Sequence, residues 1–376
     1  MPQRDLLRLK VYAMVADEVS LTPSTSESMG LRFAATLPSQ QDAMLQFLRD
    51  VFRAPAQSNS FQPAVLEWKY FRPHPNWSQP RSFLLQKADE ILAHGGVWPI
   101  RLATAGEEAQ AIHLVDWAGS PSSLGAGVHV LRNLAALADL MITIGGSQDT
   151  KKILPKLGYK NAGVLKRYVR VVRPWLQLRT RPAHDWKSPL RFLRNASATI
   201  KPLAGVPAAW RIERRSSFGA EIDAVLGTAG SPPEIRPRRS AAALNYMLNC
   251  PAADFSAYIV DADQVVIGYF MLARIGRQAR IVDIGASSGD SKLWGSLCMA
   301  AARTAAEDEG VAEIVAGTSS QQIGRVWEEL GFRLCRQDTI LVQDRRKLLP
   351  EGALLNLHLI DGDVSFLYDP QHPYMS

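Results

Sequence analysis

A turn with two glycines, Gly125 and Gly127, is the part of this 376-residue sequence best suited to chemistry. It follows a predicted strand at residues 111–117 and opens a predicted helix at residues 125–140. Glycines at a strand-to-helix turn leave backbone N–H groups uncovered at the positive end of the helix dipole. Such a turn binds a pyrophosphate without a charged side chain, so we expect an anion-binding loop here.

His113 and Asp116, on the strand before this loop, are the candidate catalytic residues. An imidazole or a carboxylate can remove the proton from an attacking amine or hydroxyl group. Their spacing of three places them on opposite faces of a regular strand, although a β-bulge would change this. Asp116 has a counterpart, Asp283, in the second half of the chain, and this favours a structural role for it.

The elements that must position these residues are short strands alternating with helices. Gly95, Gly96 and Pro99 interrupt the strand pattern, so we expect a separate strand after them, near Ile100. The predicted order is a helix at 40–52, strands at 82–86, 90–93 and near 100, the 111–117 strand, the 125–140 helix, a strand at 140–144, a short helix at 150–156 and a strand at 164–172.

The second half of the sequence repeats the first. Residues 114–116 (Leu-Val-Asp) correspond to 281–283 (Ile-Val-Asp), and residues 157–159 (Leu-Gly-Tyr) correspond to 330–332 (Leu-Gly-Phe). Between these anchors both halves have the same predicted order of elements, which indicates a tandem duplication.

The second copy lacks the glycines of the loop. The offset of 167 that relates Asp116 to Asp283 places Lys292 and Trp294 where Gly125 and Gly127 stand. A Trp side chain at that point would fill the space that a pyrophosphate needs. The loop at 285–290 keeps two glycines, so an unusual second site stays an alternative.

With these features the chain resembles the GNAT acyltransferase superfamily. Its members bind acyl-CoA through an Arg/Gln-x-x-Gly-x-Gly/Ala loop between a strand and a helix, and end the fold with a Gly-Phe. The resemblance is closest to bacterial proteins with two such domains, some linked to genes for cell-surface polysaccharides. It implies an α/β (α+β) fold of two tandem GNAT-like domains, each a mixed, mostly antiparallel sheet flanked by helices. The expected division is a flexible leader at 1–30, a first domain at 31–175, a linker at 176–207, a second domain at 208–345 and a C-terminal strand and tail at 346–376.

The resemblance implies that the first copy binds acetyl-CoA or another acyl-CoA as co-substrate. If the motif begins at Ser122, both glycines fit, but Ser122 stands where the family has Arg or Gln. If it begins at Leu124, Gly127 fits, but His129 stands where the family has its last Gly or Ala. The family's usual tyrosine acid is replaced by Leu154 in the first copy and Trp327 in the second. The residues expected to bind the cofactor are Trp117, Ala118, Ser122, Leu124, Gly125, Ala126, Gly127 and Val128.

The expected activity is transfer of an acyl group, such as acetyl, to an amine that attacks the thioester directly. The resemblance suggests an amino sugar or a surface-polysaccharide precursor as acceptor. Two alternatives stay open: an aminoacyl-tRNA-dependent transferase, which another tandem-GNAT group represents, and a non-catalytic protein of this fold that binds CoA or is structural. The glycine loop argues against the first, and the missing Tyr and Arg/Gln favour the second.

The middle of the chain is strongly basic. Residues 151–215 hold seventeen Lys and Arg but only two Asp and Glu, whereas the whole chain has a net charge of +7. Within this section, residues 186–194 alternate Trp, Leu and Phe with Lys and Arg. Such a segment could contact an anionic membrane surface or polymer, or serve as a solvated strut between domains. A nucleic-acid partner is not favoured.

Composition sets the remaining bounds. Hydrophobic residues make up 47% and charged residues 21%, which is typical of globular proteins. No signal peptide or membrane span is recognisable, so we expect a cytoplasmic protein; peripheral association with the inner membrane is the alternative. Cys250, Cys298 and Cys335 have no disulfide or metal-binding spacing, and the seven histidines have none either, so we expect no metal.

Overall fold

The structure is a computed structural model that describes residues 30–376 except 56, 104–107, 183–185, 187, 200–201 and 227–233. The predicted leader at 1–30 therefore lies almost wholly outside the described residues. The strands are β1 (Leu31–Ala35), β2 (Ser82–Lys87), β3 (Glu90–Ala103), β4 (Glu108–Gly119), β5 (Leu140–Ile144), β6 (Lys160–Val171), β7 (Trp210–Arg215), β8 (Glu234–Ile235), β9 (Asp254–Ala262), β10 (Val265–Ile275), β11 (Gln278–Ala286), β12 (Glu313–Thr318), β13 (Arg333–Asp344) and β14 (Leu354–Leu355).

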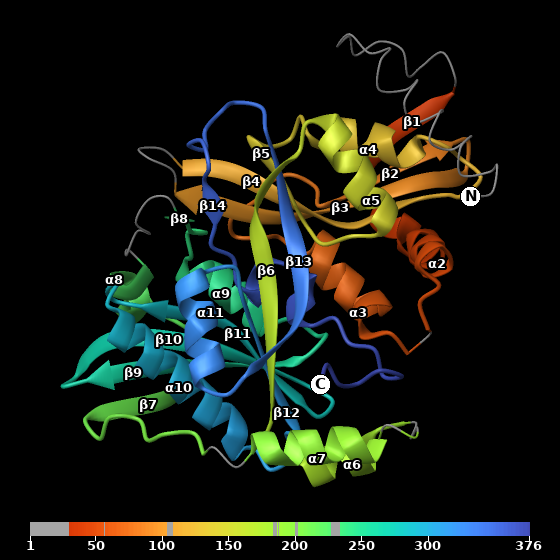
Figure 1. Cartoon of the computed structure of the whole chain (residues 1–376). Helices are drawn as coiled ribbons and strands as arrows, with labels where there is room; N and C mark the ends of the chain where they lie inside the picture. The colour runs from red at the N-terminus through yellow and green to blue at the C-terminus, as the bar shows by residue number, and fades with distance from the viewer. Residues whose placement is uncertain are drawn as a thin grey trace.

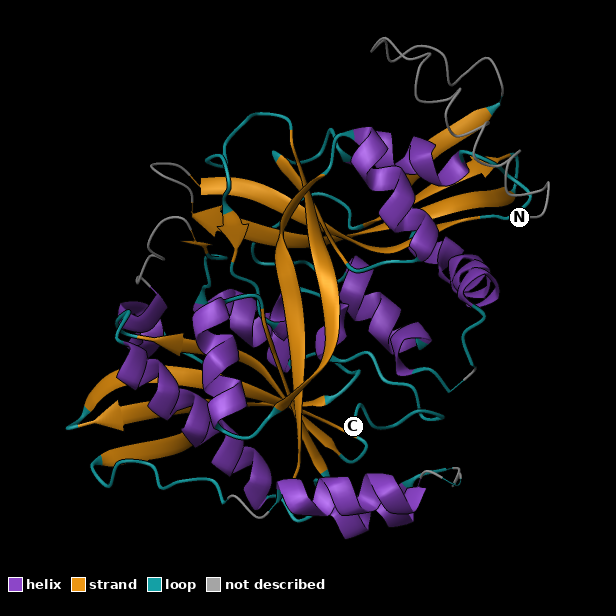
Figure 2. Cartoon of the chain, in the orientation of Figure 1, coloured by secondary structure: helices purple, strands orange, loops and turns teal. Residues whose placement is uncertain are grey.

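Helices cover this framework on both sides (Figure 2). The α-helices are α2 (Gln41–Phe52), α3 (Pro63–Leu66), α4 (Ala126–Leu134), α5 (Gln148–Ile153), α6 (Pro174–Thr180), α7 (Ser188–Ala198), α8 (Asp223–Leu226), α9 (Ala241–Leu248), α10 (Ser291–Glu307) and α11 (Gln321–Glu329). A π-helical turn, η4 (Glu67–Phe71), continues α3. Short 3₁₀ turns are η2 (Pro38–Gln40), η3 (Asn59–Phe61), η5 (Leu154–Leu157), η6 (Ala220–Ile222), η7 (Leu359–Asp361) and η8 (Asp363–Ser365).

Twelve of the described strands form one mixed, mainly antiparallel sheet in the order β1-β2-β3-β4-β5-β13-β6-β12-β11-β10-β9-β7. The pairs β4–β5 and β11–β12 are its two parallel pairs. One parallel pair lies in each half of the chain. The α/β fold class predicted from the sequence is confirmed.

The two halves exchange their last strands. β13, from the second half, pairs with β5 of the first half, whereas β6, from the first half, pairs with β12 of the second. β6 and β13 also pair with each other and run side by side through the middle of the molecule (Figure 1). The exchange joins the two predicted sheets into one, and the domain limits given above stay a prediction.

The core is divided between the two faces of the sheet. α4 packs Val130, Leu131 and Leu134 on one face of the first half, and α10 packs Leu297 and Ala301 on the second half. A third cluster is shared by both halves and holds α2, η4, α9 and the segment from β14 to η8. The C-terminal segment is therefore part of the core between the halves.

Three predicted elements differ from the structure. β3 is one continuous strand through Gly95 and Gly96. Glycine stands at both positions because neighbouring side chains pack closely there: a Cβ on Gly95 would lie 2.7 Å from Leu134, and one on Gly96 would lie 2.5 Å from the Tyr70 hydroxyl. These glycines allow close packing on both faces and do not end the strand. α4 ends at Leu134 and not at 140, and the predicted linker holds helices α6 and α7.

None of the helices in the described part of the chain is both long enough and apolar enough to cross a membrane. Within the same residues, no group of three or more His, Cys, Asp or Glu side chains is placed to hold a metal ion.

Candidate active site

Gly125 and Gly127 lie at a helix start, as the sequence predicted. α4 begins at Ala126, and Gly125 precedes it with a φ of +85°, in the left-handed region that favours glycine. Among the described residues no side chain caps the helix at Gly125. The Ala126 N–H donates to the Ser123 carbonyl oxygen at 3.3 Å, and the later N–H groups of the first turn stay available to a ligand. A Cβ on Gly125 would meet no atom within 4 Å, so the loop is open on that side.

Trp117 and Gly119 hold this helix start against the end of β4. The Trp117 indole N–H donates to the Gly127 carbonyl oxygen at 2.8 Å. A Cβ on Gly127 would lie 3.3 Å from the Trp117 indole nitrogen, and one on Gly119 would lie 3.3 Å from the Gly127 nitrogen. The glycines therefore permit a close contact between strand and helix.

The other residues expected to bind the cofactor divide into two groups. Ala118, Ala126 and Val128 are buried, so they can offer a ligand only backbone groups. Ser122 and Leu124 are exposed, and the Ser122 hydroxyl shares a hydrogen bond of 2.7 Å with the Ser120 hydroxyl. Ser122 and Leu124 are thus the members of the set with side chains that face solvent.

β4 and β5 separate next to this loop. They pair in parallel only from Ala111 to His113 on β4, although β4 continues to Gly119. Beyond His113 no strand of the described residues pairs with the edge of β4 that faces β5. The separation leaves backbone groups that an extended ligand can bind beside the start of α4.

A bulge on β4 brings His113 and Asp116 to the same face. The register with β3 changes between His94, opposite Ala118, and Gly96, opposite Val115, and Asp116 has a φ of +46°. The regular-strand expectation of opposite faces is therefore wrong at this point. Both side chains now face the Asp361–Asp363 segment: His113 contacts Asp361, and Asp116 shares a lysine with Asp363.

Asp116 lies in a buried charged network. Its carboxylate accepts hydrogen bonds from Lys69 Nζ at 2.7 Å and from the Tyr70 hydroxyl at 2.6 Å. Lys69 Nζ also lies 3.3 Å from Asp363 Oδ2, and the Lys69 side chain is fully buried. Burial acts to raise the pKa of Asp116, but Lys69 and the two hydrogen bonds outweigh it and lower that pKa. Asp116 therefore stays ionised, and its carboxylate stays hydrogen-bonded to Lys69 and Tyr70.

His113 is better placed than Asp116 to accept a proton. Burial lowers its pKa, so the ring is neutral at pH 7. Its Nδ1 lies 3.1 Å from the Asp361 carbonyl oxygen, which can only accept, so Nδ1 carries the proton and Nε2 carries the lone pair. His113 is also the last β4 residue paired with β5, where the two strands separate.

Sequence reasoning missed Lys69 and Tyr70 as members of this site, whereas it had weighed Asp361-Gly362-Asp363 as a tight turn or as an acid of the acceptor site. The signal for Lys69 was a charged residue in an aromatic run, Trp-Lys-Tyr-Phe at 68–71, which the structure forms into η4. For Asp363 the signal was the Asp-Gly-Asp at 361–363. His94 is fully buried in β3 and joins the Ser82 hydroxyl at 3.0 Å to the Asp116 carbonyl oxygen at 2.8 Å.

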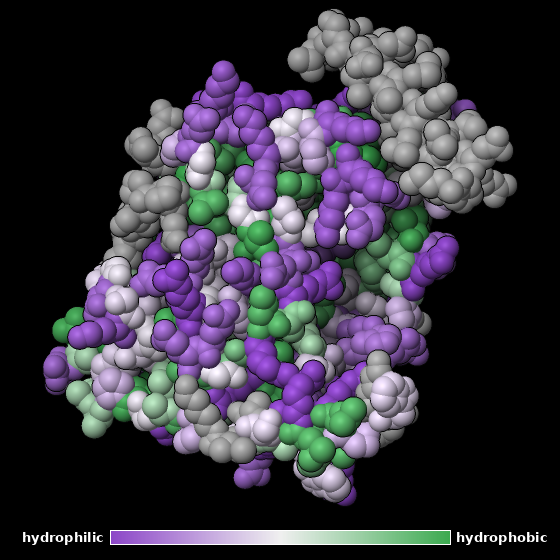
Figure 3. Space-filling view, in the orientation of Figure 1, coloured by the Kyte–Doolittle hydropathy of each residue, from purple (hydrophilic) through white to green (hydrophobic). Residues whose placement is uncertain are grey.

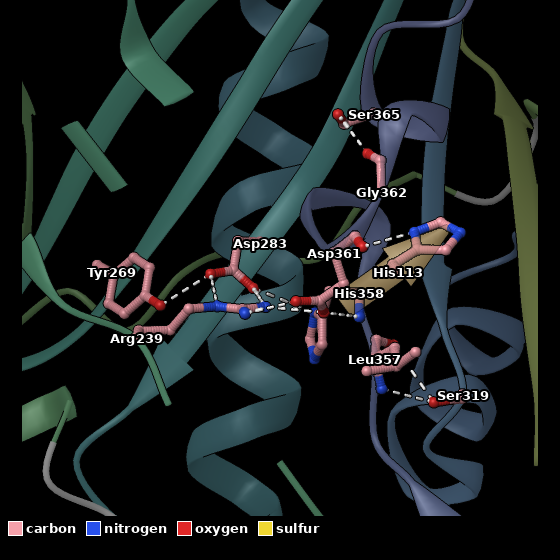
Figure 4. Close-up of polar contacts among 10 residues, drawn as sticks. All are labelled: His113, Arg239, Tyr269, Asp283, Ser319, Leu357, His358, Asp361, Gly362 and Ser365. Carbon is pink, nitrogen blue, oxygen red and sulfur yellow. Dashed lines mark hydrogen bonds and ion pairs between the residues drawn. The ribbon is translucent and has the colours of Figure 1, made fainter. Parts of the chain in front are cut away.

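The second half holds a matching network around Asp283 (Figure 4). Arg239 donates to both oxygens of Asp283 at 2.9 and 3.1 Å, and the Tyr269 hydroxyl donates to the same carboxylate at 2.9 Å. Arg239 also donates to both oxygens of Asp361 at 2.6 and 2.9 Å. Asp116 and Asp283 thus each combine one cation and one tyrosine.

The helix start of the second half differs from that of the first in charge. α10 begins after Asp290, whose carboxylate accepts from the Lys292 backbone N–H at 3.1 Å, whereas α4 begins after Gly125. The structural offset at the helix start is therefore 165, which places Lys292, and not Trp294, opposite Gly127. The expectation that Trp294 fills the phosphate space is wrong: Trp294 is buried, and the Arg236 guanidinium lies 5.1 Å from its ring.

The fold can be compared with solved structures. No family model matches the sequence, and no curated protein does. A GCN5-related N-acetyltransferase from Anabaena variabilis superposes with a TM-score of 0.56 at 10% identity, over 84% of this chain and 72% of that one. The N-myristoyltransferase of Saccharomyces cerevisiae, solved with bound myristoyl-CoA, gives a TM-score of 0.57 at 12% identity, over 87% of this chain and 89% of that one. At these identities the likeness shows the fold: this chain has the GNAT fold predicted from its sequence.

Proposed function

We propose that the protein is an acyl-CoA-dependent N-acyltransferase whose first half binds the acyl-CoA. The observation that carries this proposal is the uncapped start of α4 at Gly125, next to the point where β5 leaves β4. Uncapped N–H groups and a helix dipole suit a pyrophosphate, and the free edge of β4 suits an extended chain. Trp117, Ala118, Ser122, Leu124, Gly125, Ala126, Gly127 and Val128 line this region and would hold the cofactor.

The chemistry assigned to the site is attack of an amine on the thioester carbonyl carbon. The C–N bond forms, the C–S bond breaks, the amine loses a proton, and the CoA thiolate leaves. His113 Nε2 takes the amine proton, because the ring is neutral and its Nδ1 is held by Asp361. Asp116 acts as a positioning residue, since Lys69 and Tyr70 already occupy its carboxylate. A His113→Gln variant is expected to lose about a hundredfold in kcat and to keep its affinity for acetyl-CoA.

The second half is proposed not to bind acyl-CoA at its helix start. The Asp290 carboxylate already accepts from the N–H of the first turn and would repel a pyrophosphate. The division into domains at 31–175 and 208–345 belongs to the same proposal. It is supported by the two matching carboxylate networks and by the one parallel strand pair in each half.

Titration calorimetry with acetyl-CoA, myristoyl-CoA and a mixed tRNA separates the candidate functions. We expect binding of one acyl-CoA per chain, with release of free CoA thiol when amines are added. Binding of tRNA alone would favour the aminoacyl-tRNA-dependent alternative. Acyl-CoA binding without thiol release across amino sugars, amino acids and polyamines would favour the non-catalytic alternative.

We further propose that α6 and α7 place the protein on an anionic membrane surface. Four large hydrophobic side chains are exposed in and between these helices: Trp175 at 59%, Trp186 at 78%, Leu190 at 60% and Leu193 at 63%. Hydrophobic side chains gather over these helices at the lower edge of the molecule (Figure 3). Arg179 and Arg194 are exposed on the same helices, so apolar and cationic groups are available together, as at a lipid surface.

A further inference from the structure

A cavity of about 640 Å³ has Asp363, a member of the charged network around Asp116, in its wall. It is bounded by the segment between α2 and α3, the end of β5, strands β6, β11 and β13, and the C-terminal segment. Asp363 lines the cavity and also contacts Lys69, which contacts Asp116. The cavity therefore adjoins the network around Asp116.

Three arginines line this cavity, and two of them share one carboxylate. Arg167 donates to Asp338 Oδ2 at 2.6 Å, and Arg336 donates to Asp338 Oδ1 at 3.1 Å. Arg280 is 2% exposed, and no carboxylate of the described residues lies within 4 Å of it. A buried guanidinium that no carboxylate contacts directly is costly, and Glu313 acts on Arg280 only at longer range, so Arg280 stands out in this cavity.

The hydrogen bonds of Arg280 leave part of its guanidinium unused. Its Nε and one terminal nitrogen donate to the Gln278 side-chain oxygen at 3.1 and 2.9 Å, and its other terminal nitrogen donates to the Val364 carbonyl at 2.9 Å. These bonds use three of the five N–H donors that an arginine carries. Gln278 separates Arg280 from the buried Glu313 by donating to Glu313 at 2.9 Å.

We propose that this cavity binds the amine acceptor and that Arg280 pairs with a carboxylate of that acceptor. The proposal rests on the acyltransferase function given above and names its substrate class: an amine that also carries a carboxylate. A guanidinium binds a carboxylate through two parallel hydrogen bonds. A phosphate, with up to two negative charges, would meet more repulsion from Asp338 and Asp363 on the same walls.

The placement of Asp363 supports the orientation of such an acceptor. Asp363 directly precedes Val364, whose carbonyl accepts from Arg280, and both Asp363 and Arg280 line the cavity, so its wall carries an anionic and a cationic side chain. The acceptor carboxylate binds at Arg280, and its amine group, which attacks the thioester in the neutral form, donates a hydrogen bond toward Asp363. The amine is then held next to the network that contains Asp116.

Matched acceptors test this assignment. Thiol release from acetyl-CoA is measured with glucosamine, with muramic acid, which adds a carboxylate to the same sugar, and with glucosamine 6-phosphate. L-Alanine and L-alaninamide form a second pair. We expect kcat/KM to be at least about tenfold higher for muramic acid and alanine than for their uncharged counterparts. Equal values, or a preference for glucosamine 6-phosphate, would overturn the carboxylate assignment.

Variants at the cavity complete the test. Arg280→Gln and Arg280→Met are expected to raise KM for the carboxylate acceptors at least about tenfold, with acetyl-CoA affinity unchanged. Arg336→Gln is the control, because Arg336 lines the same cavity but is paired and 62% exposed at its side chain. A preference for carboxylates that survives both Arg280 variants refutes the proposal. Wild-type protein that binds no acetyl-CoA refutes the acyltransferase function instead, and calorimetry with muramic acid alone still tests Arg280.

Discussion

Asp361 and Asp363 are separated by a single glycine, yet their carboxylates pair with cations from opposite halves of the sequence. Asp361 accepts from Arg239, which also holds Asp283 of the second half, and Asp363 contacts Lys69, which holds Asp116 of the first. This short segment therefore links the two equivalent networks. It fixes their relative position through charges that are largely out of water.

The two aspartates are expected to differ in their contribution to stability. Asp361→Asn should lower the free energy of unfolding by about 2–3 kcal/mol, because Asp361 is 2% exposed and its carboxylate also accepts from the His358 N–H. Asp363→Asn should cost about 1 kcal/mol or less, because its side chain is 13% exposed and makes one contact at 3.3 Å. Urea unfolding measures both, and equal losses would contradict this account of the link.

Stability should fall as the pH drops below about 6.5. Burial lowers the pKa of His94 to about 4, from an ordinary value of 6.5. Between these values the unfolded chain takes up a proton that the folded chain does not, so acid favours unfolding. The contribution of His94 is about 3 kcal/mol once the pH reaches 4, at 1.36 kcal/mol for each pKa unit.

Urea unfolding at pH 7, 5.5 and 4.5 checks this prediction. A His94→Gln variant should be less stable than wild type at pH 7, but its stability should depend less on pH over this range. Parallel pH curves for the two proteins would show that His94 is not the group responsible.

Much of the fold could be predicted because its signals are local. The strand at 140–144, the helix at 40–52 and the turn at Gly125 follow from periodicity and glycine placement. The exchange of β6 and β13 could not be predicted, because strand pairing between residues about 170 apart leaves no local pattern. The Gly95-Gly96 pair was misread for a related reason: its cause is the packing of Leu134 and Tyr70 against the strand.

The candidate site was predictable only in part. His113 and Asp116 were found because they lie on the strand before the glycine loop. Their common orientation depends on a β-bulge in β4, and no residue type in this stretch predicts that bulge. Lys69 could not be assigned, since its partners Asp116 and Asp363 are brought to it by tertiary packing alone.

Substitutions at equivalent helix positions test which half binds CoA. Gly127→Glu places a negative charge in the first turn of α4 and should lower acetyl-CoA affinity about a hundredfold, or about 3 kcal/mol. Lys292→Glu is the matched control, because Lys292 is exposed at the same position of α10. Its effect on acetyl-CoA affinity should be small. Calorimetry on both variants decides, and similar losses would mean that the two halves share in binding.

The membrane proposal predicts binding that needs both lipid charge and the exposed apolar side chains. In flotation assays, wild-type protein should associate with vesicles that contain phosphatidylglycerol and not with pure phosphatidylcholine. Raising salt from 0.05 to 0.5 M should weaken the association, because the Debye length falls from above 10 Å toward a few Å.

The variants of the α6–α7 region separate its two kinds of contact. A combined Trp186→Ser, Leu190→Ser and Leu193→Ser variant should lose most vesicle binding and keep its thermal stability, because these side chains are exposed. Val265→Ser, at a site 63% exposed on β10, is the control and should bind as wild type does. Arg191→Glu with Arg194→Glu should abolish the preference for anionic lipid. Binding to heparin with no binding to vesicles would assign these helices to an anionic polymer. Binding unchanged in every variant would leave α7 as a strut that packs against β6, with α6 packed on α7.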